Sequence, residues 1–201
     1  MLRFLIYLLP LNLLSQIPSN FEIGQKPSDK ILNIEMINID DKLYSLNNLS
    51  SNNGLLIIFS SNTCPFVLMW QDRYKIIEEI CKENELGLVY INSNSKNRND
   101  VDSHSNMKNY HLNNNLQFPY LLDKNNIVAD YFEAKTTPHI FLLNNNYELI
   151  YKGAIDDNYK SYKDVTNFYI NDAIYNMINK QPLILNYTKP VGCSIKRLSV
   201  K

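Results

Sequence analysis

The chain has 201 residues, enough for one domain of ordinary size with extensions at its ends. Its 20 basic and 20 acidic residues balance, so no net charge draws the protein to nucleic acid or to an anionic membrane surface. We therefore expect neither of these as a partner.

The first residues have the pattern of a secretory signal peptide. Arg3 gives a short positive region, and residues 4–14 form an apolar run of the length that signal peptides use. The run is too short for a stable membrane-spanning helix, and Pro10 interrupts it. We interpret residues 1–19 as a signal peptide and 20–30 as a linker or irregular lead-in. This predicts export to a periplasmic or extracellular compartment, where disulfides persist. The alternative is an apolar N-terminal element of the mature fold.

The next part of the chain has a strand–helix–strand pattern. Residues 31–39 alternate in polarity and 42–46 are extended, which predicts a small hairpin. The apolar run 55–60 indicates a buried strand. Apolar residues at helical spacing follow over 69–84, and a second buried strand is expected over 88–92. A strand, a helix and a strand in this order predict two parallel strands.

Helices and strands continue to alternate in the second half. We expect a weak helix over 103–112, an extended run over 118–122, a short helix over 126–132 and an antiparallel hairpin of 140–143 and 148–152. Asp164 is expected to cap a final amphipathic helix. Residues 182–201 form a semi-extended tail. The order predicts an α/β domain over residues 31–181, with a central mixed sheet flanked by helices.

Cys64 is the first candidate for chemistry. It follows the buried strand 55–60 and directly precedes Pro65, a residue that suits the first turn of a helix. Free N–H groups and the helix dipole stabilise a thiolate at such a position and lower its pKa. A reactive thiol is therefore one interpretation. The other is a small buried hydrophobe, since free cysteines are often buried.

Cys193 is the second candidate. Three cysteines allow at most one internal disulfide. Cys193 stands in a Gly-Cys-Ser segment of the tail, outside any core pattern, whereas Cys81 lies on the apolar face of the helix 69–84. If the tail folds back, Cys193 can resolve a mixed disulfide or sulfenate on Cys64; the alternative is an ordinary tail residue. The three histidines and the cysteines are not spaced as a ligand set, so we expect no metal and no other cofactor.

Five separated motifs over residues 30–197 resemble one family. They are Asn62–Val67, Phe118–Leu121, Thr137–His139, Tyr151–Asn158 and Gly192–Lys196. With the element order, they are similar to the thioredoxin-like redoxins of the AhpC/TSA class. The resemblance implies a thioredoxin-like fold with an N-terminal β-hairpin and an insertion before a cis-proline at Pro138. It also implies a substrate groove beside Cys64 that is formed by Thr63, Pro65, Thr137 and Pro138.

The chain departs from both standard mechanisms of that class. Val67 stands where a thioredoxin has its second cysteine, and Ile58 where it has an acid. Ile57 and Ser61 stand where a peroxiredoxin has proline and threonine, and Ser61 is expected to keep a hydroxyl near the thiolate. The strand 140–143 carries no arginine that corresponds to the peroxidase arginine.

Two hypotheses follow. In the first, the protein is a thiol-dependent oxidoreductase with Cys64 as nucleophile and Cys193 as resolving thiol. It acts on protein disulfides or, as a second choice, on hydroperoxides, and its partner is a thiol or disulfide protein that serves as substrate or reductant. In the second, the protein is a redox-inert binding module that holds an extended chain in the Pro138 groove. The oligomeric state stays open.

Overall fold

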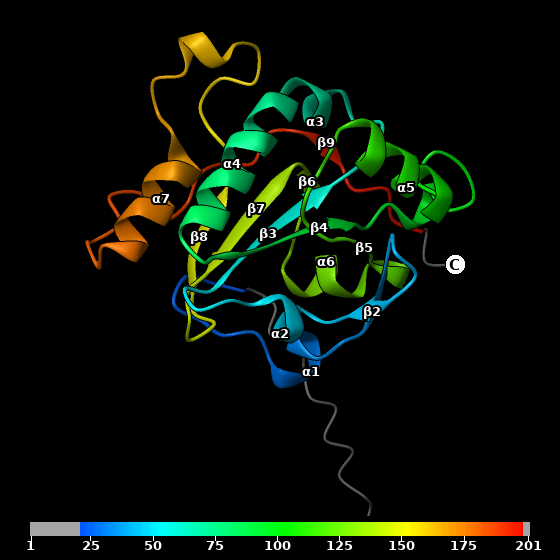
Figure 1. The fold of residues 1–201 in the computed structure, drawn as a ribbon, viewed down its shortest axis with the longest axis horizontal. Helices are drawn as coiled ribbons and strands as arrows, with labels where there is room; N and C mark the ends of the chain where they lie inside the picture. The colour runs from blue at the N-terminus through cyan, green and yellow to red at the C-terminus, as the bar shows by residue number, and fades with distance from the viewer. Residues whose placement is uncertain (1–20, 199–201) are drawn as a thin grey trace, which may run out of the picture.

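The computed structural model describes residues 21–198 (Figure 1). The expected signal peptide at residues 1–19 lies outside this range. Between residues 21 and 198, no helix combines the length and the apolar character that a membrane crossing requires.

A seven-stranded mixed sheet forms the centre of the molecule. In spatial order its strands are β2 (Leu43–Tyr44), β1 (Met36–Asn38), β5 (Tyr120–Leu122), β4 (Gly87–Asn92), β3 (Leu55–Ser60), β7 (His139–Leu143) and β8 (Leu149–Gly153). β3 pairs in parallel with β4, as predicted, and antiparallel with β7. The predicted hairpins β1–β2 and β7–β8 are both antiparallel pairs. The α/β class is therefore confirmed.

Helices cover both faces of the sheet (Figure 1). One face carries α3 (Pro65–Met69), α4 (Gln71–Glu83), α5 (His104–Asn113) and α7 (Tyr169–Ile178), and the other carries α1 (Asp29–Leu32), α2 (Leu46–Leu49) and α6 (Ile127–Tyr131). Short 3₁₀ helices lie at Ser95–Asn97, Lys124–Asn126 and Tyr162–Asp164. A separate two-stranded sheet joins β6 (Thr136–Thr137) to β9 (Cys193–Ser194).

β3 separates two hydrophobic cores. Leu56 and Ile58 pack on the α4 and α7 side, whereas Leu55, Ile57 and Phe59 pack on the α1, α2 and α6 side. All six residues of the strand are buried. This double burial explains the unbroken apolar run, since a central strand covered on both faces needs no polar alternation.

The predicted strand 31–39 is wrong in its first half, where the chain forms α1 and becomes a strand only at Met36. Ile31 and Leu32 are both buried in the same core. Adjacent residues of a strand point to opposite faces, so a strand could not bury both there. A turn of helix can, and Asp29 in its first turn complements the helix dipole.

The helix expected over 69–84 is confirmed as α4, and Pro65 begins a separate short helix, α3, before it. The two helices meet at Trp70, whose backbone leaves helical geometry and whose indole N–H donates to the buried Asp156 at 2.7 Å. The predicted start of the last helix needs correction. Asp164 does not cap α7. It ends a 3₁₀ turn, and the helix begins at Tyr169 because Asp157 holds the intervening Thr166 through its backbone N–H and its hydroxyl.

Both ends of the described chain pack on the domain. Residues 21–28 have no regular structure, but Phe21 is buried with its ring centroid 5.0 Å from that of Phe132. At the other end, the backbone of Lys152 bonds the backbone of Asn186 and Thr188. From there the tail runs to the N-terminal end of α3, where it forms β9 (Figure 1).

Candidate active site

Cys64 lies between the end of β3 and the first residue of α3, the junction that the sequence predicted. Its side chain is buried, with 5% of the residue exposed. The thiol donates a hydrogen bond to the carbonyl oxygen of Thr137, with a sulfur–oxygen distance of 3.0 Å. The Thr137–Pro138 peptide bond is cis, the geometry that the sequence analysis expected there. Cys64 therefore contacts the segment that contains the cis-proline.

The C-terminal tail brings Cys193 to the same place. In the β6–β9 pair Cys193 lies opposite Thr137, and the Ile195 N–H donates to the carbonyl of Lys135 one step further along. Gly192 makes this close approach possible, because a Cβ atom at that position would lie only 2.3 Å from the Thr137 carbonyl oxygen. The tail therefore folds back to Cys64, which is the condition that the sequence analysis set for Cys193 to act as a resolving thiol.

The two thiols lie close enough to change each other's pKa. Burial raises the pKa of Cys64, but hydrogen bonds from the side chains of Thr137 and Cys193 and from backbone N–H groups favour the thiolate, so the pKa is lowered overall. Burial and the adjacent Cys64 raise the pKa of Cys193. Both residues are free thiols. The negative charge therefore resides preferentially on Cys64, with the Cys193 thiol as its hydrogen-bond donor.

Cys81 takes no part in this contact. It is fully buried in the core beneath α4. Burial and, to a smaller extent, the charge of Glu78 raise the pKa of its thiol. A protonated thiol without solvent contact is a poor nucleophile, as the sequence pattern indicated.

The predicted groove residues differ in their surroundings. Thr63 and Pro65 flank Cys64 and are exposed, whereas Thr137 and Pro138 are buried. The backbone of Thr137 is paired with β9. The protein's own tail therefore lies along the part of the groove that the sequence assigned to substrate.

A buried hydrogen-bond network holds the loop before Cys64. The carboxylate of Asp102, which is fully buried, accepts from the Ser61 hydroxyl and the Asn62 N–H at 3.3 Å each. It also accepts from the side-chain amides of Asn92 at 2.8 Å and Asn94 at 3.0 Å. Sequence reasoning missed this network. A signal was present, because polar residues directly follow the carboxyl ends of two adjacent parallel strands.

The Ser61 hydroxyl, which was expected near the thiolate, donates its hydrogen bond to Asp102. The described residues contain three arginines, and each has its polar partners elsewhere: Arg73 bonds Asp156, Arg98 bonds the carbonyls of Asn92 and Asp102, and Arg197 bonds Asp130. The surroundings of Cys64 therefore consist of backbone groups, Thr137 and the second cysteine.

The sequence profile of the AhpC/TSA family matches residues 27–152. The chain belongs to the AhpC/TSA family. The matched region contains Cys64 and Pro138 but ends before Cys193. No curated protein matches the chain at a significant level.

Solved structures confirm the thioredoxin-like fold. An uncharacterized conserved protein from Geobacillus kaustophilus is 26% identical with a TM-score of 0.81, and the match covers 90% of this chain and 95% of that one. A hypothetical protein from Sinorhizobium meliloti 1021 is 25% identical with a TM-score of 0.79, over 90% and 97% of the two chains. The peroxidoxin BcpB from Mycobacterium tuberculosis is 13% identical with a TM-score of 0.59, over 80% and 98%, and shows the fold alone.

Proposed function

We propose that the protein is a thiol–disulfide oxidoreductase whose redox pair is Cys64 and Cys193. The observation that carries this proposal is the contact of the two thiols where β6 pairs with β9. Membership in the AhpC/TSA family supports thiol-dependent redox chemistry in general. The distribution of charge assigns the roles, since the thiol with the lowered pKa is the better nucleophile at neutral pH.

The first step is attack by the Cys64 thiolate on a substrate disulfide. A bond forms between Cys64 Sγ and one substrate sulfur, the substrate S–S bond breaks, and the departing thiolate takes a proton from solvent. In the second step Cys193, as a thiolate, attacks Cys64 Sγ and releases the second substrate thiol. The substrate gains two electrons and two protons, and the protein is left with a Cys64–Cys193 disulfide. An external dithiol must reduce this disulfide before the next cycle.

Access to Cys64 requires movement of the tail. Cys64 is buried, while Cys193 is only half-buried and lies against it. A substrate chain that pairs with Thr137 must take the place of β9, because both use the same backbone groups. We infer that the tail leaves when substrate binds and returns to complete the second step.

A protein disulfide fits this site better than a hydroperoxide. The backbone of β6 offers an extended chain a pairing edge, and the tail already demonstrates that geometry. A peroxidase needs donors that stabilise the peroxide oxygens, yet the Ser61 hydroxyl and the three described arginines have other partners. The redox-inert binding module is the weaker alternative, because such a module has no need for two thiols in contact.

The location of the protein is part of the proposal. The signal-peptide pattern at residues 1–19 supports export to an oxidising compartment. There a soluble exchange enzyme would meet protein disulfides as substrates and a thiol protein as its reductant.

Single-cysteine variants test the reaction. We expect the full-length protein to reduce a disulfide-bonded model peptide with a dithiol reductant, and Cys64→Ser to abolish turnover. Cys193→Ser should accumulate a mixed disulfide on Cys64, detected by mass spectrometry, with turnover at least tenfold lower. Cys81→Ser is the matched control and should keep the wild-type rate. Full turnover by Cys193→Ser would exclude the internal pair, and no mixed disulfide in any variant would exclude exchange chemistry.

A further inference from the structure

The docked end of the tail lies on the body as an extended chain with alternate side chains turned toward the protein. Cys193 lies opposite Thr137 in the antiparallel β6–β9 pair. Cys193 is half-buried and Ile195 is buried, whereas Ser194 and Lys196 are exposed. This period of two is that of a strand. A chain that adds to a sheet edge gains affinity from its backbone and specificity from its alternate side chains.

Backbone groups hold the tail in a way that does not depend on its sequence. The Ile195 N–H donates to the Lys135 carbonyl at 3.1 Å. The Lys196 N–H donates to the side-chain oxygen of Asn94 at 2.8 Å, and the Lys196 carbonyl accepts from the Lys96 N–H at 2.9 Å. Every residue except proline carries both backbone groups, so another extended chain can make the same bonds.

Two positions of the tail depend on the side chain that they carry. A Cβ atom on Gly192 would lie 2.3 Å from the Thr137 carbonyl oxygen and 2.7 Å from its carbon, and these backbone atoms cannot rotate away. The position before the cysteine therefore selects glycine. Ile195 is 5% exposed and packs with the core on the α6 side of the sheet. The second position after the cysteine therefore selects an aliphatic side chain.

A third position is selected by charge. The Arg197 Nε donates to the Asp130 carboxylate at 2.7 Å, and its Nη2 donates to the Ala134 carbonyl at 2.8 Å. The Asp130 side chain is exposed, so this ion pair contributes less than the two steric positions. Asp130 and Ala134, with residues 94, 96 and 135–137, form the docking track of the tail.

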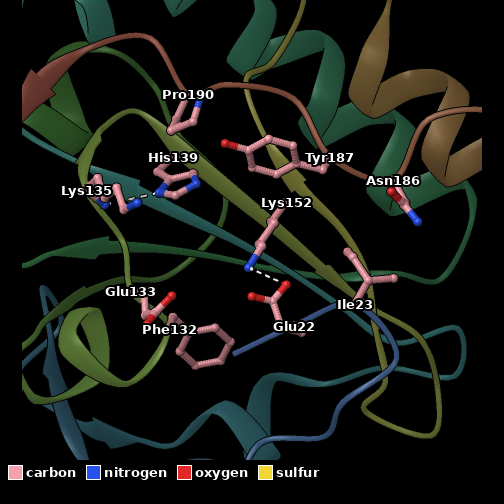
Figure 2. Close-up of a pocket in the computed structure, with 10 residues that line it drawn as sticks. All are labelled: Glu22, Ile23, Phe132, Glu133, Lys135, His139, Lys152, Asn186, Tyr187 and Pro190. Carbon is pink, nitrogen blue, oxygen red and sulfur yellow. Dashed lines mark hydrogen bonds and ion pairs between the residues drawn. The ribbon is translucent and has the colours of Figure 1, made fainter. Parts of the chain in front are cut away.

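An anchor holds the tail before it reaches the docking track. The Lys152 N–H donates to the Asn186 carbonyl, and the Thr188 N–H donates to the Lys152 carbonyl, each at 3.1 Å. The Thr188 hydroxyl also bonds the Tyr151 hydroxyl at 2.6 Å. After this anchor the chain passes Pro190, which borders the cavity drawn in Figure 2. An incoming chain therefore has to replace only the segment that follows the anchor.

We propose that the docking track selects substrate proteins by the sequence around their reactive cysteine. The segment has glycine directly before the cysteine, an aliphatic residue two positions after it and arginine four positions after it. This rests on the proposed function, in which a substrate chain takes the place of β9. The substrate cysteine then occupies the position of Cys193, against Cys64. The tail is an internal copy of the substrate segment and covers Cys64 until a matching chain displaces it.

Peptides with the sequence of residues 189–197, each with its cysteine joined to a coloured aryl thiol, test the docking track on full-length Cys193→Ser. The Cys64 thiolate attacks the peptide sulfur, a Cys64–peptide disulfide forms, and the aryl thiolate leaves with the electron pair of the broken S–S bond. Alanine in place of the glycine, or serine in place of the isoleucine, should slow this release about tenfold. Alanine at the exposed serine is the control and should react at the parent rate.

The selection of arginine has a charge-swap test. A peptide with glutamate in place of the arginine should react about threefold more slowly than the parent peptide. In full-length Cys193→Ser that also carries Asp130→Lys, the order of these two peptides should reverse. Asp172→Lys, at an exposed position of α7, is the matched control and should keep the original order. An unchanged order in Asp130→Lys would contradict the role of Asp130.

A binding measurement separates this proposal from the redox chemistry. The parent peptide with serine in place of its cysteine cannot react. At about millimolar concentration, comparable with that of a tethered segment, it should displace the tail of the wild-type protein and speed hydrogen exchange of the Ile195 and Lys196 amides. The alanine-for-glycine peptide should not.

The two measurements have distinct outcomes. Glycine-dependent displacement without any Cys64–peptide disulfide would support the docking track and refute only the exchange reaction. Equal release rates for all peptides would overturn the proposal even if exchange is fast, and so would tail displacement that does not depend on the glycine.

Discussion

Cys64 and Cys193 meet at one point, but the segments that carry them are held in different ways. Cys64 follows the central strand β3, which has a partner on each side, and Asp102 fixes the loop before it. The tail from 182 to 198 is mostly exposed or half-buried, and β9 pairs over only two residues. Segments with few buried contacts open at low free-energy cost. The comparison indicates a fixed nucleophile and a partner that leaves and returns.

The largest expected effect is a loss of stability when the loop before Cys64 is no longer held by Asp102. In Asp102→Asn, an amide NH₂ group replaces one of the two carboxylate oxygens. Both oxygens accept hydrogen bonds from buried N–H groups, and an NH₂ group cannot accept one, so at least one buried donor loses its partner. We expect a loss of roughly 2–4 kcal/mol in the free energy of unfolding. Denaturant titration measures it, with the exposed Asp100→Asn as control. Equal stability of the two variants would mean that the network does not hold the loop.

The sequence predicts the structure around Cys64 where the interactions are between residues close together in the chain, and fails where they join distant residues. β3, β4 and the Cys64 junction were predictable, because a continuous apolar run and a following Pro65 are local signals. The polar residues after β3 and β4 are a local signal of a polar cluster at that edge of the sheet. They do not identify its acceptor, because Asp102 lies up to 41 positions from the residues that it bonds. Asp156 is likewise a buried acceptor for the side chains of Trp70 and Arg73, which lie more than 80 positions before it in the chain.

A smaller effect is expected in the tail that carries Cys193, on the rate at which the two cysteines form a disulfide. In Gly192→Ala, the new Cβ would meet the Thr137 carbonyl at 2.3 Å, so the tail must shift. We expect the rate of Cys64–Cys193 disulfide formation to fall about tenfold, which corresponds to about 1.4 kcal/mol. Quenched-flow alkylation with mass spectrometry follows this rate, and the exposed Ser194→Ala is the control. A wild-type rate in Gly192→Ala would show that the docked tail is not needed for the reaction.

The tail was only partly predictable for a related reason. Pro182, Pro190 and the Gly-Cys-Ser segment indicate an extended segment outside the core, and its length permits it to reach Cys64. The register of β9 on β6 depends on how Gly192 fits against Thr137. That fit exists only in three dimensions, because nothing in the sequence near Cys193 identifies residue 137 as its neighbour.

The smallest effect concerns the pH dependence of the two thiols. Only the thiolate reacts with iodoacetamide, and the pKa of Cys64 is lowered whereas that of Cys193 is raised. As pH increases, the reactivity of Cys64 should therefore reach its midpoint before that of Cys193. Cys193→Ala removes a donor to the thiolate and should move the Cys64 midpoint to higher pH, while Cys81→Ala should not. Alkylation followed by peptide mass mapping gives both midpoints. The reverse order would exchange the roles of the two cysteines.

Disulfide mapping of the full-length protein, equilibrated in glutathione buffers of increasing oxidising strength, tests the central claim most directly. The account predicts that a monomeric species with a Cys64–Cys193 linked peptide appears first, while Cys81 stays a free thiol. Its formation should depend on the ratio of reduced to oxidised glutathione and should reverse when a dithiol is added. Oxidation that yields only glutathione adducts on Cys64, with Cys193 free, would contradict the account.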